Sequence, residues 1–164
     1  MKTRRLQRNA SGRPGDDTGE AMEIDRLQEQ DLPQLASLYR ELIDKEACPE
    51  KMPSVLRAMR DNPDYVVLVA KEGEDVIGSV MGVVCLDLFG KCNPFMVVEN
   101  MIVSRTSRHS GVGTLLMREL ERFAAERHCN YLMLLSNSRR ADAHAFYEKM
   151  GYDPSGFRGF KKYL

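Results

Sequence analysis

The sequence lacks several features that mark common classes of protein. It has no Trp, only 7% aromatic residues, and 24 basic residues matched by 24 acidic ones, so its formal net charge is zero. Nucleic-acid-binding proteins usually combine a basic surface with aromatic stacking residues, and this composition favours neither. No apolar run approaches the roughly 20 residues that cross a bilayer, and the N-terminus lacks an apolar signal core. We therefore expect a cytoplasmic protein with no nucleic-acid or membrane partner.

Cysteine is scarce and widely spaced. The four cysteines form no CxxC pair, and no His stands at ligand spacing from any of them: Cys48, Cys85, Cys92 and Cys129. Structural zinc sites need paired Cys or His ligands a few residues apart. The spacing therefore predicts single thiols and no metal.

The residues that are present can build one domain. A chain of 164 residues with 43% hydrophobic residues is long enough to bury a substantial core. Residues 1–20 show no apolar periodicity and mix basic residues with Gly, Pro and Asp, which predicts a disordered tail. The folded domain is expected from residue 21 to residue 164.

The apolar pattern of this domain predicts a mixed α/β fold. Alternating and apolar runs predict strands, and apolar residues at a spacing of three to four predict helices. Strands are expected at residues 22–27, 65–70, 75–88, 95–103, 131–136 and 156–164, and helices at 31–43, 54–61, 112–127 and 142–150. A strand, helix and strand in succession imply a parallel pair with a right-handed crossover. We therefore expect a mostly antiparallel sheet of about six or seven strands with one parallel pair, flanked by about four helices.

The two early helices are a candidate wall for substrate. The acidic residues of this wall, in the first helix and in the segment between the two helices, are Glu41, Asp44, Glu46 and Glu50. Such a wall would favour a cationic substrate, although a charged helix face is more often simply solvated.

The stretch from residue 97 to residue 119 is typical of an anion-binding turn. An apolar strand passes through the turn RHSGVG into an amphipathic helix. Gly111 and Gly113 let the backbone approach an anion, and the free N–H groups of the helix N-terminus attract it. A P-loop would need Lys and Ser or Thr after the second glycine, and a dinucleotide site would need a third glycine. Neither is present.

Two motifs together resemble the GNAT superfamily of N-acetyltransferases. Residues 103–113, VSRTSRHSGVG, are similar to its acetyl-coenzyme-A pyrophosphate motif, and residues 143–152, AHAFYEKMGY, are similar to its AxxFYEKxGF/Y segment. The order of predicted elements is also the family's order. The sequence departs from the pattern at His109, where Gly is usual, and at Arg105, where Pro is frequent.

The resemblance implies an acetyl-CoA-dependent transfer to an amine with two catalytic residues. Glu99 occupies a position where the family often places a general base, and Tyr147 is its usual proton donor to the departing thiolate. Strand alternation predicts that Glu99, Met101 and Val103 share one face, opposite Val98, Asn100 and Ile102.

The resemblance also implies a set of residues that bind acetyl-CoA and no metal. The set is Met101, Ile102, Val103, Arg108, His109, Ser110, Gly111, Val112, Gly113, Thr114 and Asn137. His144 is expected to have only a packing or solvated role. The expected acceptor is a small-molecule amine acetylated directly in a ternary complex, and a homodimer is possible in this family. A protein N-terminal or lysine acetyltransferase, or a non-catalytic acyl-CoA-binding module, are the alternatives.

Overall fold

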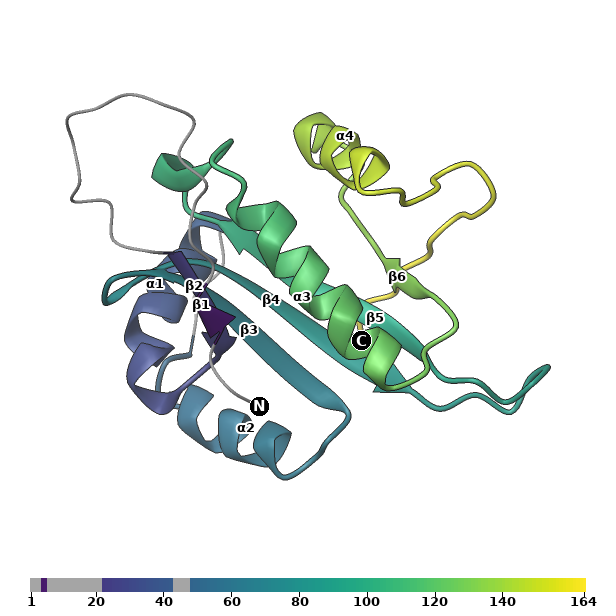
Figure 1. Cartoon of the computed structure of the whole chain (residues 1–164), viewed down its shortest axis with the longest axis horizontal. Helices are drawn as coiled ribbons and strands as arrows, with labels where there is room; N and C mark the ends of the chain where they lie inside the picture. The colour runs from purple at the N-terminus through teal and green to yellow at the C-terminus, as the bar shows by residue number, and fades with distance from the viewer. Residues whose placement is uncertain (1–3, 6–21, 43–47) are drawn as a thin grey trace.

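The computed structural model describes residues 4–5, 22–42 and 48–164, which form one sheet with helices on both faces (Figure 1). The strands are β1 (Arg4–Arg5), β2 (Met22–Arg26), β3 (Tyr65–Glu72), β4 (Asp75–Cys85), β5 (Phe95–Val103) and β6 (Leu132–Leu134). The helices are α1 (Leu32–Leu42), α2 (Met52–Arg60), α3 (Val112–Glu126) and α4 (Ala141–Lys149), and short 3₁₀ turns precede α1 and α3, at Glu29–Asp31 and Arg105–Ser107.

The strands lie in the sheet in the order of the sequence, from β1 to β6. All neighbours are antiparallel except β5 and β6, which are parallel because α3 carries the chain back between them. The predicted mixed α/β fold and its single parallel pair are therefore confirmed. Most of the predicted tail lies outside the described residues, and its residues Arg4–Arg5 pair with β2.

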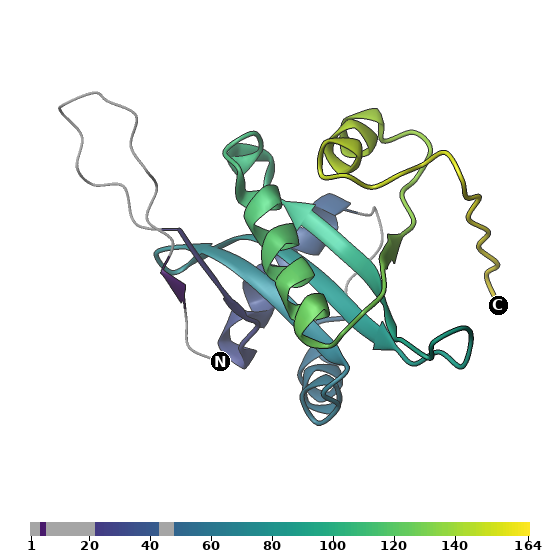
Figure 2. The same cartoon turned by 45° about the vertical axis from the view of Figure 1, so that its right-hand side comes forward.

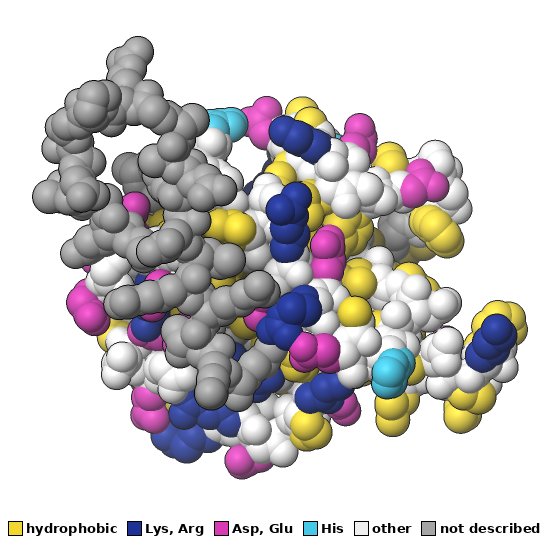
Figure 3. Space-filling view, viewed as in Figure 1, with side chains coloured by type: hydrophobic (Ala, Val, Ile, Leu, Met, Phe, Trp, Pro, Cys, Tyr) yellow, Lys and Arg dark blue, Asp and Glu magenta, His cyan; other side chains and the backbone are white. Residues whose placement is uncertain are grey.

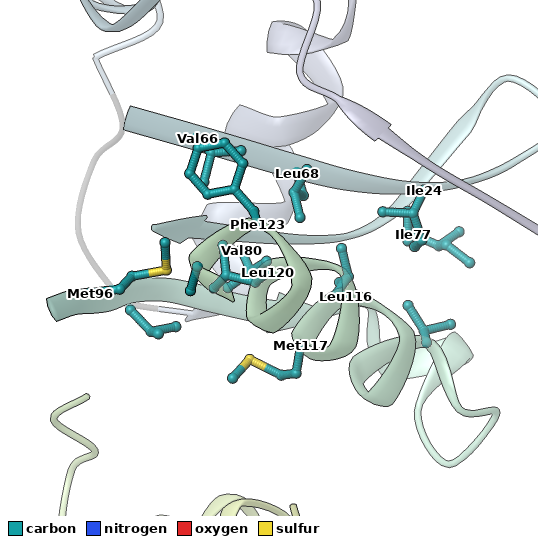
Figure 4. Packing of buried hydrophobic residues seen from close by; sticks show 14 of the residues in the cluster. Ile24, Val66, Leu68, Ile77, Val80, Met96, Leu116, Met117, Leu120 and Phe123 are labelled. Carbon is teal, nitrogen blue, oxygen red and sulfur yellow. The ribbon is translucent and has the colours of Figure 1, made fainter. Parts of the chain in front are cut away.

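Helix α3 covers one face of the sheet and contributes much of the main core. Leu116, Met117, Leu120 and Phe123 point from α3 onto the apolar side chains of β2, β3, β4 and β5 (Figure 4). A Cβ at Gly82 of β4 would meet the Cδ1 of Leu120 at 2.7 Å. The absence of a side chain at this position therefore lets the helix lie directly on the strand.

Helices α1 and α2 cover the opposite face (Figure 2). The α1 leucines Leu32, Leu35 and Leu38 are buried, as the helical spacing predicts. Asp31 lies in the 3₁₀ turn that directly precedes α1. Its carboxylate accepts hydrogen bonds from the backbone N–H of Gln28 at 2.9 Å and from Lys71 Nζ at 2.6 Å, which ties the turn to β3.

The strand predicted at residues 156–164 is absent. Residues 153–164, the C-terminal segment, have no regular secondary structure and no ladder pairing in the sheet. The predicted strand over residues 131–136 is also shorter, because β6 ends at Leu134. The aromatic residues of this segment favour a strand, but a strand also needs a neighbour with which its backbone can form hydrogen bonds. The C-terminal segment forms no such pairing with β6.

No helix among the described residues is long and apolar enough to cross a membrane.

Candidate active site

A cleft of about 410 Å³ opens where β5 and β6 part. The two strands pair only from Met96 with Leu132 to Val98 with Leu134, and beyond this point the ladder stops. The cleft is lined by Val98, Glu99, Asn100, Met101, Leu134, Leu135, Ser136, Asn137, Arg139, Arg140, Tyr147 and Lys161. It brings the end of the parallel pair together with α4 and the C-terminal segment.

A bulge in β5 determines which side chains share a face. Asn100 has a φ of 54°, and between the pairs formed by Glu99 and Ile102 strand β5 holds one residue more than β4. Ile102 packs with the α1 side of the core, whereas Met101 packs with the α3 side. The predicted alternation is therefore wrong for Glu99, which shares a face with Ile102. Met101 and Val103 share a face as predicted, and that face is also the face of Val98.

Both predicted catalytic residues line this cleft. Glu99 is exposed on β5, and Tyr147 is half-buried on α4, where its ring packs edge-on against Phe146 at 5.3 Å and Tyr152 at 5.9 Å. Burial raises the pKa of Tyr147, the charge of Arg140 opposes that rise, and the charge of Glu99 adds to it. The Tyr147 hydroxyl therefore stays protonated at neutral pH and can donate a proton.

The turn before α3 has the backbone conformation of an anion cradle. His109 and Gly111 have φ values of 63° and 89°, and no side chain of the described residues caps the helix at Gly111. Ser110 Oγ donates to the Ser107 carbonyl at 2.6 Å, and Arg108 Nε lies 3.5 Å from the Val103 carbonyl oxygen. The first N–H groups of α3 thus remain available to a ligand.

Gly113 joins this turn to the cleft. A Cβ at Gly113 would lie 3.2 Å from Met101 Cε and 3.3 Å from Phe146 Cζ, so β5, α3 and α4 converge here. Val112 and Ile102 are buried in the core, which leaves only their backbone groups for a ligand, and Thr114 is half-buried in the first turn of α3.

Asn137 lies in the cleft, where it also organises the loop before α4. Its Oδ1 accepts the backbone N–H of Arg139 at 3.0 Å, and its carbonyl oxygen accepts that of Arg140 at 3.0 Å. The Nε2 of His144 lies 3.0 Å from the same carbonyl oxygen. This contact agrees with the packing role expected for His144.

Sequence reasoning missed five polar residues of the cleft: Asn100, Ser136, Arg139, Arg140 and Lys161. The adjacent pair Arg139 and Arg140, a few residues after the end of β6, was the available signal for two of them. Lys161 gave none, because its position depends on the path of the C-terminal segment. The Ser136 hydroxyl is buried and has no hydrogen-bond partner within the described part of the chain.

The two described residues of the predicted acidic wall, Glu41 and Glu50, do not line the cleft. Glu41 receives the backbone N–H of Arg105 at 3.2 Å and lies 3.9 Å from its guanidinium, and Glu50 is exposed. Asp44 and Glu46 lie outside the described residues. Helix α2 contributes instead to a separate cavity of about 80 Å³ beside β2 and β3.

The residues present fit coenzyme A. Open space lies around the Cβ position of Gly111, and the uncapped N-terminus of α3 offers donors to a pyrophosphate. Ser136 lines the cleft, and its buried hydroxyl has no hydrogen-bond partner within the described residues. No group of three or more His, Cys, Asp or Glu residues in the described part of the chain could hold a metal ion.

The family profile described as "Acetyltransferase (GNAT) family" matches residues 30–152. The chain belongs to the GNAT family. Proteins of this family generally use acetyl-CoA as the acyl donor.

Two curated proteins are similar to parts of this GNAT chain. "Acetyl transferase GW6a" of Oryza sativa subsp. japonica is 31% identical over 118 residues, which cover 65% of this chain and 28% of that protein. "Uncharacterized protein YdhI" of Bacillus subtilis (strain 168) is 29% identical over 75 residues, which cover 46% of this chain and 44% of that protein. The match thus spans less than half of the length of either relative.

Solved GNAT structures share the fold closely. A candidate acetyltransferase from Agrobacterium tumefaciens has a TM-score of 0.78 and 25% identity, covering 86% of this chain and 99% of that one. Glucosamine-6-phosphate N-acetyltransferase from Arabidopsis thaliana has a TM-score of 0.77 and 17% identity, covering 87% and 99%. An aminoglycoside acetyltransferase from an uncultured soil metagenomic sample has a TM-score of 0.75 and 19% identity, covering 87% and 96%. The last two likenesses concern the fold alone.

Proposed function

We propose that this GNAT chain is an N-acetyltransferase that transfers the acetyl group of acetyl-CoA directly to the primary amine of a small molecule. The observation that carries the proposal is the cleft between β5 and β6, which holds Glu99 and Tyr147 and whose lining residue Met101 packs beside Gly113 at the uncapped N-terminus of α3. A cytoplasmic location, where acetyl-CoA is available, belongs to the same proposal.

The turn and the cleft would hold the co-substrate. The backbone of residues 108–114 would bind the pyrophosphate, with Arg108 adding a full positive charge. Backbone groups of Met101, Ile102 and Val103, together with Asn137, would orient the pantetheine arm where β5 has left its partner strand. The mobile arm would then be fixed at both ends.

Glu99 and Tyr147 would handle the two protons of the transfer. An alkylamine with a pKa near ~10.4 is mostly protonated at neutral pH, so Glu99, directly or through water, would take the proton that frees the nitrogen lone pair. The nitrogen forms a bond to the thioester carbon, and the carbon–sulfur bond breaks. Tyr147 would donate its hydroxyl proton to the departing sulfur, which leaves as the thiol, and the second proton lost by the nitrogen would return through solvent to the Tyr147 oxygen.

The size of the cleft supports a small acceptor. About 410 Å³ lies within the range of small-molecule sites, roughly 300–1,000 Å³. Two of the structures with this fold carry names that specify small amines, a glucosamine 6-phosphate and aminoglycosides, as the acceptors of those proteins. A protein N-terminus or a lysine side chain in a peptide is the competing acceptor.

The experiment compares acceptors in one assay of free-thiol release from acetyl-CoA. The panel contains amino sugars, aminoalkylphosphonates, polyamines, and peptides with a free N-terminus or an internal lysine. We expect kcat/KM for at least one small amine to exceed that for every peptide by about tenfold or more, a difference of ~1.4 kcal/mol in transition-state binding. A peptide that matches or exceeds all the small amines would overturn the small-molecule assignment.

A further inference from the structure

The cleft between β5 and β6 has more positive than negative side chains in its lining. Its cations are Arg139, Arg140 and Lys161, and Glu99 is the only carboxylate among the lining residues. The whole chain, by contrast, has equal numbers of basic and acidic residues. On the face of the molecule that Figure 3 shows, Lys and Arg side chains are likewise intermixed with Asp and Glu side chains. The excess of positive charge is therefore a local property of the cleft.

The three cations come from two separate parts of the chain. Arg139 and Arg140 stand directly before α4, whereas Lys161 stands in the C-terminal segment. Figures 1 and 2 show the chain after α4 turning back towards β6. A Cβ at Gly159 would collide with the side chain of Leu135, so the C-terminal segment passes directly beside the end of β6. This path brings Lys161 to the same cleft as the two arginines.

These cations have no carboxylate partner within the described residues. None of the ion pairs in that part of the chain includes Arg139, Arg140 or Lys161. Lys161 Nζ lies 5.3 Å from the centroid of the Tyr163 ring, which leaves its charge uncompensated. A single exposed cation is simply solvated, whereas three that line one cleft raise the local concentration of an anion.

The N-terminus of α4 adds to this positive charge. Arg140 is the N-cap residue, and no side chain of the described residues caps the helix. The first N–H groups of a helix have no intrahelical acceptors, and the macrodipole places partial positive charge at that end. Asp142, the acidic residue of the first turn, does not line the cleft. The helix end and the cations beside it therefore favour the same kind of ligand group.

We propose that the acceptor amine carries an anionic group, such as a phosphate, phosphonate or carboxylate, which Arg139, Arg140 and Lys161 bind. This inference rests on the proposed acetyl transfer and names the chemical class of its acceptor. Glu99 then serves the ammonium end of the acceptor, so the charges of a zwitterionic acceptor complement those of the cleft. A polyamine would instead place additional positive charge beside three cations, which selects against it.

The phosphates of coenzyme A are a second source of negative charge. Burial raises the pKa of the Tyr147 hydroxyl, and the charge of Arg140 opposes that rise, so the guanidinium acts close to the proposed proton donor. The pantetheine arm separates the reacting sulfur from the phosphates of the co-substrate, and the turn at residues 108–114 is the proposed site for its pyrophosphate. Since the acceptor must lie at the reacting end, the position of Arg140 favours the acceptor as the source of the anion.

The test is equilibrium binding of paired amines to the full chain saturated with coenzyme A, measured by isothermal titration calorimetry. The pairs are 2-aminoethylphosphonate with propylamine, and glucosamine 6-phosphate with glucosamine. We expect the anionic member of at least one pair to bind about tenfold more tightly than its neutral partner, or better. Arg140→Gln and Lys161→Met should each reduce this preference, and the double variant should abolish it.

Two further variants separate charge from position. Lys161→Arg keeps the charge and should keep the preference for the anionic amine. Lys162→Met is the matched control, because Lys162 is exposed in the same segment and does not line the cleft. It should bind both members of each pair as the wild type does. Circular dichroism establishes that each variant is folded before its affinity is interpreted.

Titration with coenzyme A and with 3′-dephospho-coenzyme A distinguishes the two sources of the anion. The proposal predicts that Arg140→Gln and Lys161→Met change the Kd for either compound by less than about twofold, as expected for independent sites. A loss of affinity for coenzyme A that is absent for the dephospho compound would assign these cations to the co-substrate and overturn the proposal.

The outcomes for this inference and for the proposed function are distinct. Equal binding of the two members of both pairs to the wild type overturns the anionic acceptor, and so does a preference that survives in the double variant. Acetylation of neutral and anionic amines with equal kcat/KM would also overturn it while leaving the N-acetyltransferase activity established. Binding that depends on the anion, without thiol release from acetyl-CoA, would support the anion-binding site and contradict the acetyl transfer.

Discussion

At the scale of the residue, Tyr147 is the side chain whose surroundings bear most directly on chemistry. Burial raises the pKa of its hydroxyl above the ordinary value near ~10, so the protonated form is favoured through the whole neutral range. As pH rises through that raised pKa, the donor is lost. If loss of this proton donor limits the reaction, the rate of acetyl transfer should fall only above about pH 10.

We expect Tyr147→Phe to lower kcat by about 10²-fold while the Kd for acetyl-CoA stays nearly unchanged, because only the proton donor is removed. Tyr152→Phe is the matched control. Tyr152 packs on the same ring at 5.9 Å but does not line the cleft, and its buried hydroxyl has no partner within the described residues. That variant should retain the wild-type kcat. Equal rates for wild type and Tyr147→Phe would contradict the assignment.

Glu99→Gln tests the proton acceptor. Without the carboxylate, the amine must lose its proton to solvent, so the pH–rate profile should move towards higher pH, in the direction of the amine's own pKa of about 10.4. The measurement is kcat/KM from pH 6 to 10 for the best amine. Glu148→Gln removes an exposed carboxylate on α4 beside Tyr147 and should not shift the profile. An unshifted profile in Glu99→Gln would exclude Glu99 as the base.

At the scale of the element, the turn that starts α3 depends on a left-handed backbone. Gly111 has a φ of 89° with nothing within 4 Å of its Cβ position, so Gly111→Ala would be strained by conformation and not by a clash. We expect a loss of about 1–2 kcal/mol in the free energy of unfolding, measured by chemical denaturation. Gly156→Ala is the control, since Gly156 also has open space and lacks the positive φ. A change in Gly111→Ala no larger than in the control would show that the turn tolerates a side chain.

The elements around the site could be predicted because the signals for them, glycine placement and helical spacing, lie within short stretches of sequence. The turn at residues 103–113 and the helix that ends before Gly151, with its φ of 92°, follow from glycine placement and helical spacing. The face of Glu99 could not be predicted in the same way. The bulge at Asn100 interrupts a run of strand-forming residues, and period-two counting has no means of detecting one extra residue.

Contacts between distant segments were equally beyond the sequence. Residues 156–164 have the aromatic composition of a strand, yet pairing depends on which edge is within reach. Lys161 and Arg140 enter the cleft from segments that the fold brings together. Sequence patterns therefore predicted the turn, and the family resemblance pointed to Tyr147, while the full electrostatic lining of the cleft required the three-dimensional arrangement.

At the scale of the whole molecule, the sheet brings the turn proposed to bind acetyl-CoA close to the cleft that contains the proposed catalytic residues. Helix α3 lies between the parallel strands β5 and β6 in the sequence, and the cleft where these strands part is lined by Tyr147 of α4 and by Met101, which packs beside Gly113 in the first turn of α3. A chain that had the anion-binding turn but did not catalyse acetyl transfer would be an acyl-CoA-binding module. The presence of both Glu99 and Tyr147 in the cleft favours an enzyme.

The most direct test of this account is the stoichiometry of acetyl transfer by the full chain. Acetyl-CoA and the amine panel are incubated with the protein, free thiol is titrated, and acetylated amine is quantified by mass spectrometry. The account predicts one acetylated amine for each thiol released, with at least one small amine as acceptor and no release from enzyme heated beyond unfolding. Binding of acetyl-CoA without thiol release on any amine would contradict it and identify the chain as an acyl-CoA-binding module.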